Sequence, residues 1–189
     1  MKYFKISAVL AAIALVCSVI IASINLLTSP VIARNEKQTE LQTIQKIFTD
    51  YDEDKSSTVL DVNESITKKI LAADKDGKAL GNVYIVTGKN SYGKITLMVA
   101  IKDGSLLQVE FITNEQSYSS TVDAHLSANY PSSDKSSIQI GFAPKASDKV
   151  GTLTEENVEN VDVKCGATFG AKLVKELIQK AFEDYNTAN

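Results

Sequence analysis

The apolar positions of the chain follow three patterns, and the first is an unbroken run near the N-terminus. Residues Ile6 to Leu27 form 22 consecutive positions without a charged side chain, enough for a helix to cross the roughly 30 Å hydrocarbon core of a bilayer. A secretory signal peptide normally has a shorter apolar region and a small-residue cleavage site. We therefore predict an uncleaved transmembrane anchor over residues 6–27, after a short tail at residues 1–5, with cleavage as the alternative.

The second pattern has the 3.6-residue period of an amphipathic helix. It occurs from Asn35 to Phe48 and predicts an exit helix that continues or follows the anchor. It is strongest near the C-terminus, where one face carries Phe169, Leu173, Val174, Leu177, Ile178, Ala181, Phe182 and Tyr185. A shorter segment around Val122 and Leu126 predicts a helix with His125 beside its apolar face. A surface or core-edge histidine is the ordinary interpretation there, and a general base is the alternative.

The third pattern consists of short segments rich in β-branched and aromatic residues, bounded by turn residues. Lys69–Ala73 and Ala79–Val86 predict one strand pair, and Ile95–Ile101 and Leu106–Ile112 predict another. Each pair is joined by a turn that contains Asp and Gly. We predict an α+β fold with a central antiparallel sheet and flanking helices. It forms one domain at residues 58–189, after an exit helix and linker at 28–57 whose polar part, Asp50 to Ser57, is a loop.

Composition excludes several classes of function. The formal net charge is −3 and no basic block occurs, which argues against a nucleic-acid surface built from Lys and Arg. One histidine and two distant cysteines, Cys17 and Cys165, provide no metal-ligand set of recognised spacing, no disulfide framework and no catalytic constellation. We therefore assign no catalytic residue and no metal site.

The charges that flank the anchor are nearly balanced. Lys2 and Lys5 precede it, and Arg34 and Lys37 follow it closely, so the positive-inside rule alone does not orient it. A tail of five residues with a large translocated domain is the arrangement that we predict. The domain would then lie outside the cytoplasm.

Candidate chemistry concentrates in the heptapeptide Asp162-Val163-Lys164-Cys165-Gly166-Ala167-Thr168, which ends where the C-terminal helical pattern begins. Thr168 is predicted at or beside the N-cap, where the first N–H groups lack partners within the helix and the dipole favours an anion. A phosphate suits that position, and Gly166 and Ala167 leave room for a large ligand. An ordinary N-cap threonine after an ordinary loop glycine is the alternative.

The heptapeptide resembles the flavin-attachment signature Asp-x-x-(Ser/Thr)-Gly-Ala-Thr of FMN-binding domains in the G subunit of Rnf electron-transport complexes. The C subunit of sodium-pumping NADH:quinone reductases is similar. In that family a magnesium-dependent flavin transferase joins FMN through its phosphate to the threonine hydroxyl. The resemblance implies that Thr168 is the acceptor, and the candidate cofactor-binding residues are Thr168, Ala167, Gly166, Cys165 and Asp162.

Two further segments resemble the same family, and the chain departs from it at several positions, among them Lys94, where a proline is frequent. The stretch 25–36 is similar to the exit from the membrane in Rnf G subunits, and 91–106 is similar to their glycine-tyrosine-glycine hairpin. Cys165 stands where Ser or Thr is usual, and Gly170 stands where a hydroxyl residue is common. The stretch 114–120 replaces a Glu-Thr-Pro-Gly-Leu-Gly loop that the family places near the isoalloxazine, and only Glu115 of it is kept.

Four tyrosines, Tyr84, Tyr92, Tyr118 and Tyr130, are candidates for stacking on a flavin, although half-buried packing is the ordinary role of tyrosine in a sheet protein. The resemblance implies an electron carrier with covalent FMN, anchored among the membrane redox subunits of an Rnf-type complex and matured by a flavin transferase. Its alternatives are a stand-alone flavinylated carrier for extracellular electron transfer and a membrane-anchored interaction module without flavin. An electron-transfer subunit is not an independent catalyst.

Overall fold

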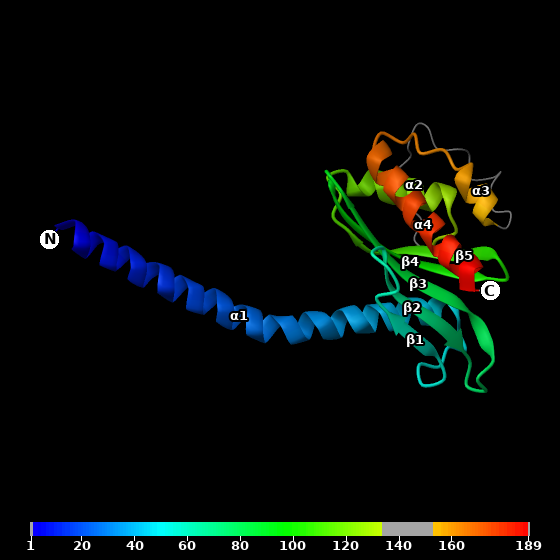
Figure 1. The fold of residues 1–189 in the computed structure, drawn as a ribbon, viewed down its shortest axis with the longest axis horizontal. Helices are drawn as coiled ribbons and strands as arrows, with labels where there is room; N and C mark the ends of the chain where they lie inside the picture. The colour runs from blue at the N-terminus through cyan, green and yellow to red at the C-terminus, as the bar shows by residue number, and fades with distance from the viewer. Residues whose placement is uncertain (1, 134–152, 189) are drawn as a thin grey trace. The chain divides into compact units, whose positions relative to one another are not determined.

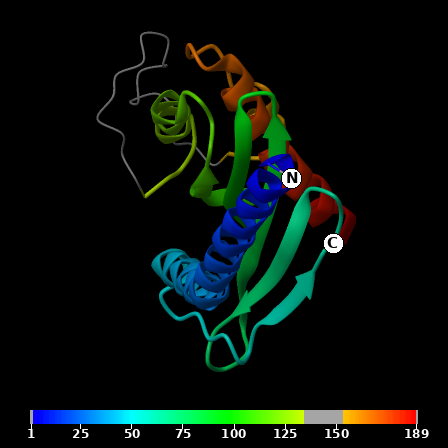
Figure 2. The same cartoon turned by 90° about the vertical axis from the view of Figure 1, so that its left-hand side faces the viewer.

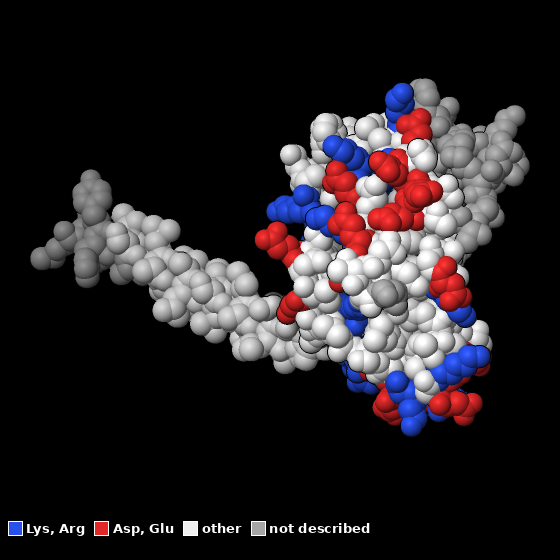
Figure 3. Space-filling view, turned by 45° about the vertical axis from the view of Figure 1, so that its right-hand side comes forward, with Lys and Arg blue, Asp and Glu red and all other residues white. Residues whose placement is uncertain are grey.

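The computed structural model describes residues 2–133 and 153–188, which belong to two compact units, Met1–Gln42 and Thr43–Asn189. Helix α1 (Lys2–Ile47) makes up the first unit and ends in the second. The predicted anchor and exit helix are therefore one continuous helix. Its segment Val9–Val31 is long and apolar enough to cross a membrane, and none of it is buried. No charged side chain occurs in this segment, whereas charges of both signs lie on the face of the second unit that Figure 3 shows.

Three hydroxyl groups inside the apolar segment form hydrogen bonds within the helix itself. The hydroxyls of Ser18, Ser23 and Thr28 donate to carbonyls four residues earlier, at 2.8, 2.7 and 2.9 Å. Pro30 lies inside the helix and removes one N–H donor from the ladder. Because these hydroxyls already have hydrogen-bond partners in the helix, transfer of the segment from water to a bilayer leaves none of the three unpaired.

The second unit is built on a five-stranded antiparallel sheet in the order β1-β2-β3-β4-β5 (Figures 1 and 2). Its strands are β1 (Ser57–Leu60), β2 (Ile66–Ala73), β3 (Ala79–Asn90), β4 (Gly93–Lys102) and β5 (Ser105–Asn114). The predicted antiparallel sheet is confirmed, and the four predicted strands correspond to β2 through β5. Strand β1 was missed, because all four of its residues are exposed and it therefore has no buried alternation to mark it.

Local turn chemistry joins the strands. Between β2 and β3, the Asp74 carboxylate accepts the N–H groups of Asp76 and Lys78 at 2.9 and 2.8 Å. Between β4 and β5, Asp103 and Gly104 both have positive φ, at 51° and 72°, as a type I′ hairpin turn requires. These two turns are the ones that the Asp-Gly pairs predicted.

In the part of this unit that the structure describes, three helices accompany the sheet: α2 (Ser119–Asn129), α3 (Glu155–Glu159) and α4 (Thr168–Ala188). Helix α4 lies along β3 and β4, with α2 and α3 beside it (Figure 1). The approach is close, since a Cβ on Gly88 of β3 would lie 2.8 Å from Leu173 Cδ1 and 3.1 Å from Leu177 Cδ2. An ion pair between Lys69 of β2 and Asp184 of α4, 2.5 Å long, fastens the other end of the helix to the sheet.

The core lies between α4 and the sheet and matches most of the predicted helical face. Val174, Leu177, Ile178, Ala181 and Phe182 are each buried to 1% exposure or less. Tyr84 and Tyr130 are buried with them, which assigns these two tyrosines to packing. Ile44 and Phe48, from the end of α1 and the residue after it, are also buried within this unit.

Candidate functional site

The N-terminus of α4 is defined by one backbone hydrogen bond. The Ala171 N–H donates to the Ala167 carbonyl at 3.0 Å, so Ala167 is the N-cap and Thr168 is the first helical residue. The N–H groups of Thr168, Phe169 and Gly170 precede this bond and have no acceptor within the helix. The exposed Thr168 hydroxyl therefore lies where a helix of 21 residues concentrates its positive potential.

The loop that leads into α4 turns sharply at Gly166, which has a φ of +81°. This left-handed conformation is rarely adopted by residues with a side chain. A Cβ at Gly166 would meet only Thr121 Cγ2, at 4.0 Å. Backbone conformation, rather than lack of space, is therefore the local reason for glycine at this position.

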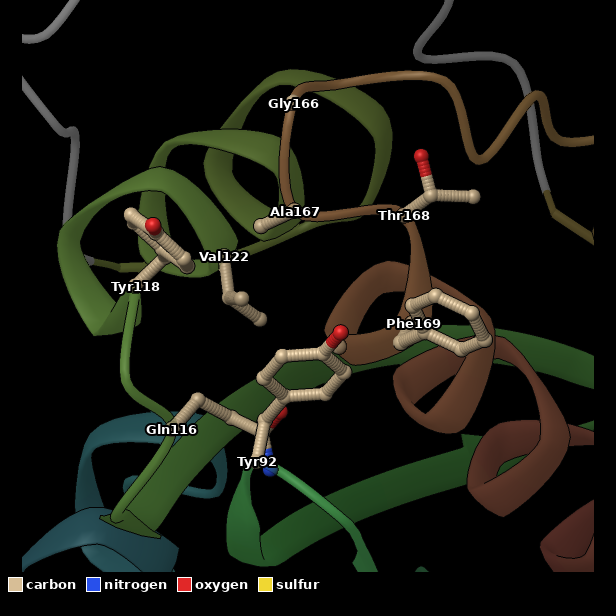
Figure 4. A pocket seen from close by; sticks show the side chains of 9 residues that line it. Tyr92, Gln116, Tyr118, Val122, Gly166, Ala167, Thr168 and Phe169 are labelled. Atoms are coloured by element: carbon tan, nitrogen blue, oxygen red, sulfur yellow. The ribbon is translucent and has the colours of Figure 1, made fainter.

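A pocket of about 230 Å³ opens at the start of α4 (Figure 4). Three segments that are far apart in the chain form its walls: the β3–β4 turn, the β5–α2 loop with the start of α2, and the loop into α4. The lining residues are Tyr92, Gln116, Tyr118, Val122, Gly166, Ala167, Thr168, Phe169 and Gly170. Three of the five residues predicted for the site, Gly166, Ala167 and Thr168, thus lie in one pocket wall.

Aromatic side chains provide the flat walls of this pocket. The rings of Tyr92 and Phe169 stack with centroids 5.5 Å apart and an interplanar angle of 28°. Tyr118 lies on the α2 side (Figure 4). Tyr92, Phe169 and Tyr118 are 43%, 64% and 62% exposed. Of the four tyrosines considered from the sequence, Tyr92 and Tyr118 therefore remain candidates for contact with a ligand.

Phe169 corrects the predicted buried face of α4, because its ring points into the pocket instead of the core. The first turn of α4 is buried through Gly170 and Ala171. A Cβ on Gly170 would lie 2.5 Å from Val122 Cγ2, so α2 is too close there for a larger side chain. The first turn of α4 is helical like the rest, but it packs against α2 through small residues instead of a large apolar side chain.

Asp162 and Cys165, the other two predicted site residues, do not line the pocket. The Asp162 carboxylate accepts the Lys164 N–H at 3.0 Å, and its carbonyl lies 2.8 Å from His125 Nε2. Cys165 is 4% exposed. Burial raises the pKa of its thiol, the Asp162 charge raises it further, and the Ala167 N–H partly offsets both. Asp162 and Cys165 therefore shape the loop, and Cys165 does so as a neutral thiol.

His125 is more deeply buried than its place in the sequence suggested, at 1% exposure. The physical reason is its Nε2 contact with the Asp162 carbonyl, which gives a ring nitrogen a polar partner inside the core. This contact also fastens the loop into α4 to α2. His125 lies outside the pocket lining.

The sequence did not reveal how Gln116 and Val122 join the site. Gly93 has a φ of +142°, and a Cβ there would lie 2.1 Å from the Glu115 carbonyl oxygen. Backbone bonds from Ser117 N–H to the Tyr92 carbonyl and from Glu115 N–H to the Lys94 carbonyl, at 3.0 and 2.9 Å, hold the two loops together. In the sequence, only the glycine beside Tyr92 indicated a close approach of another segment. Which loop approaches it is decided by tertiary packing.

The donor set of the pocket suits a phosphate-bearing aromatic ligand. Free N–H groups at the start of α4 can receive a phosphate, and Tyr92, Phe169 and Tyr118 offer surfaces for a flat ring. The volume is below the roughly 300–1,000 Å³ of pockets that enclose a drug-sized ligand, so part of a flavin nucleotide would extend beyond it. Among the residues that the structure describes, no cluster of three or more His, Cys, Asp or Glu side chains could hold a metal.

Comparison with known proteins agrees with this geometry. Residues 91–183 match the FMN-binding domain, and residues 3–47 match the RnfG N-terminal region. The chain is also similar to the G subunit of the proton-translocating ferredoxin:NAD(+) oxidoreductase complex of Clostridium ljungdahlii, with 26% identity over 175 residues that cover 91% of this chain and 85% of that protein. All of the pocket-lining residues fall within the segment that matches the FMN-binding domain.

Proposed function

Because the chain belongs to the FMN-binding domain family, we propose that it is a membrane-anchored flavoprotein electron carrier with FMN joined through its phosphate to Thr168. The observation that carries this proposal is the position of Thr168: it is an exposed residue, the first of α4, in the wall of an aromatic pocket. Glycine and alanine precede it and leave the hydroxyl accessible. Burial or a core-facing hydroxyl would have argued against attachment.

The attachment step requires an enzyme partner and an activated flavin. We propose that Thr168 Oγ1 forms a bond to the phosphorus, the hydroxyl proton is lost, and the group that activated the phosphate leaves with the bonding electrons. A flavin transferase is the expected partner for this step. The free N–H groups of α4 stabilise the negative charge of the phosphate once it is bound.

A covalent link fits the limited enclosure of the pocket. A cavity of about 230 Å³ buries only part of a flavin nucleotide, so enclosure alone would retain it weakly. Outside the cytoplasm, a cofactor that dissociates is lost. A phosphoester at Thr168 retains the cofactor and leaves the pocket residues to orient it.

Bound FMN supplies one- and two-electron transfer, while the protein supplies tethering, orientation and electrostatics. We propose that the chain relays electrons among membrane redox subunits of an Rnf-type complex. The match of residues 3–47 to the RnfG N-terminal region and the similarity over 91% of the chain to a protein of such a complex support this role over a stand-alone carrier. Anchoring by α1 raises the effective concentration of the domain near membrane partners.

We propose that the domain after α1 lies outside the cytoplasm. Protease added to intact spheroplasts should remove the domain. Cleavage only after the membrane is opened would reverse the orientation.

Intact mass spectrometry tests the attachment. The full-length protein, made with a flavin transferase, should gain the mass of one FMN less one water, and Thr168→Ala should abolish the gain. Thr121→Ala is the matched control, since Thr121 lies close to Gly166 but outside the pocket lining, and it should still be modified. An unmodified wild-type chain, or modification that survives Thr168→Ala, would contradict the proposed acceptor.

Purification from membranes of the native host separates the role in a complex from its alternatives. A flavinylated chain that copurifies with other membrane redox subunits supports the complex. A flavinylated chain that is isolated alone favours the stand-alone carrier. An unmodified chain in those membranes, with the transferase present, favours the interaction module.

A further inference from the structure

Gln116 is buried at the pocket without using all of its hydrogen-bonding capacity. It is 6% exposed and lies between β5 and α2. Its backbone N–H donates to Asn114 Oδ1 at 3.2 Å, and its Nε2 donates to the Gly93 carbonyl at 2.7 Å. Because a carbonyl can only accept, this second bond fixes which end of the amide is nitrogen. Within residues 2–133 and 153–188, no donor contacts Gln116 Oε1.

The free Oε1 atom faces the first turn of α4. It lies 3.2 Å from the position that a Cβ on residue 170 would occupy, and both Gln116 and Gly170 line the pocket. Glycine at position 170 therefore places no side chain against this acceptor. Where related domains commonly carry a hydroxyl on the helix at this position, the polar atom here is contributed by the β5–α2 loop.

An acceptor that lines the pocket, with no protein donor among the described residues, selects for a donor on the ligand. A bound phosphate offers oxygen acceptors, so Oε1 is unsuited to receive it, and the phosphate belongs with the N–H groups and Thr168. The next part of FMN along its chain is the ribityl group, whose hydroxyls are donors. Gln116 and Thr168 line the same pocket, so Oε1 is available to the part of the ligand that follows the phosphate.

We infer that Gln116 Oε1 accepts a hydrogen bond from a ribityl hydroxyl of the attached FMN and holds the flavin in the pocket. The inference rests on the proposed attachment at Thr168. Gln116 is a ligand-binding residue in this role, and the Gly93 carbonyl positions it. Tyr92 and Phe169 then provide the surface against which the held flavin packs.

Two variants of the flavinylated full-length protein in detergent separate this role from a structural one. Gln116→Met removes both the acceptor and the bond to Gly93. Gln116→Glu keeps an acceptor, but it loses that bond and adds a negative charge. Gln179→Met, on α4 outside the pocket lining, is the matched control. Intact mass confirms attachment in each variant, and flavin fluorescence anisotropy with iodide quenching measures how much of the attached flavin is held.

Gln116→Met should lower the ratio of held to released flavin about tenfold, as expected for the loss of one good hydrogen bond. Gln116→Glu should keep more flavin held than Gln116→Met, because it retains an acceptor, and Gln179→Met should stay close to wild type. Equal losses in Gln116→Met and Gln116→Glu would assign the effect to the Gly93 contact and overturn the inference. So would no change in Gln116→Met, or a change in reduction potential without release, which would place the contact at the ring. An unmodified wild-type mass would instead show that the proposed attachment itself had failed.

Discussion

Gly93 shows how a single residue holds the pocket together. Its positive φ places the β3–β4 turn against the backbone of the β5–α2 loop, where a Cβ would be 2.1 Å from the Glu115 carbonyl oxygen. Backbone atoms cannot move aside as the end of a flexible side chain can. Tyr92 and Gln116 consequently reach the pocket from two loops that share one contact.

Gly93→Ala should destabilise the fold by more than the loss of glycine freedom alone. Strain at positive φ and the clash together are expected to cost about 2–4 kcal/mol. Gly77→Ala is the matched control, because Gly77 has a φ of +79° but a Cβ added there would have no atom within 4 Å. Its expected cost is therefore only the backbone strain of an L-residue at positive φ, about 1 kcal/mol. Urea unfolding of the full chain, followed by tyrosine near-ultraviolet CD, measures the difference; equal costs would contradict the steric argument.

At the scale of elements, α4 has two functions along its length. From Val174 to Phe182 it buries one face against β3 and β4. Its first turn packs through Gly170 and Ala171 and presents Thr168 and Phe169 to the pocket. The apolar period of the sequence therefore predicts the part of α4 that packs in the core. It also assigns the first turn to the core, which the structure does not.

Paired substitutions on α4 test this division. Leu177→Ala should destabilise the fold by about 2–5 kcal/mol, because Leu177 is 1% exposed and a cavity would remain. Phe169→Ala should cost less than about 1 kcal/mol, since its 64% exposed ring loses mainly the stacking contact with Tyr92. Thermal unfolding of both variants provides the comparison. If Phe169→Ala destabilised the fold as much as Leu177→Ala, the Phe169 ring would have to be assigned to the core.

At the scale of the whole molecule, one chain combines an apolar helical segment with a folded domain, and the two differ in where their apolar side chains lie. Val9–Val31 is exposed throughout and apolar, while the second unit buries its apolar residues between a sheet and a helix. Similarity to a protein of a membrane redox complex spans 91% of the chain. Membrane attachment and the flavin site are therefore both expected features of the same protein.

A charge in the apolar segment should weaken membrane insertion without affecting the domain. Ile13→Lys places a charge within Val9–Val31 and is expected to cost about 3 kcal/mol of insertion free energy. Ile13→Val is the control. Carbonate extraction should release a larger fraction of the lysine variant, and equal retention of both variants would argue that this segment is not the anchor.

The sequence alone determined those features that depend on local spacing and composition. Apolar length predicted the N-terminal helix, alternation with Asp-Gly turns predicted four strands, and the 3.6-residue period predicted most of α4, because each pattern reflects the geometry of one element. The heptapeptide located Thr168 at a helix start for the same reason. Its likeness to a known signature also indicated FMN, which spacing does not specify.

Only the tertiary structure decided which residues from distant parts of the chain come into contact. It separated the buried Tyr84 and Tyr130 from the pocket residues Tyr92 and Tyr118, moved Phe169 out of the core, and joined Gln116 to Gly93 and Gly170 across three segments. It also added β1, an exposed strand without a pattern of its own. These outcomes depend on contacts between residues far apart in the chain, and such contacts leave no period in the sequence.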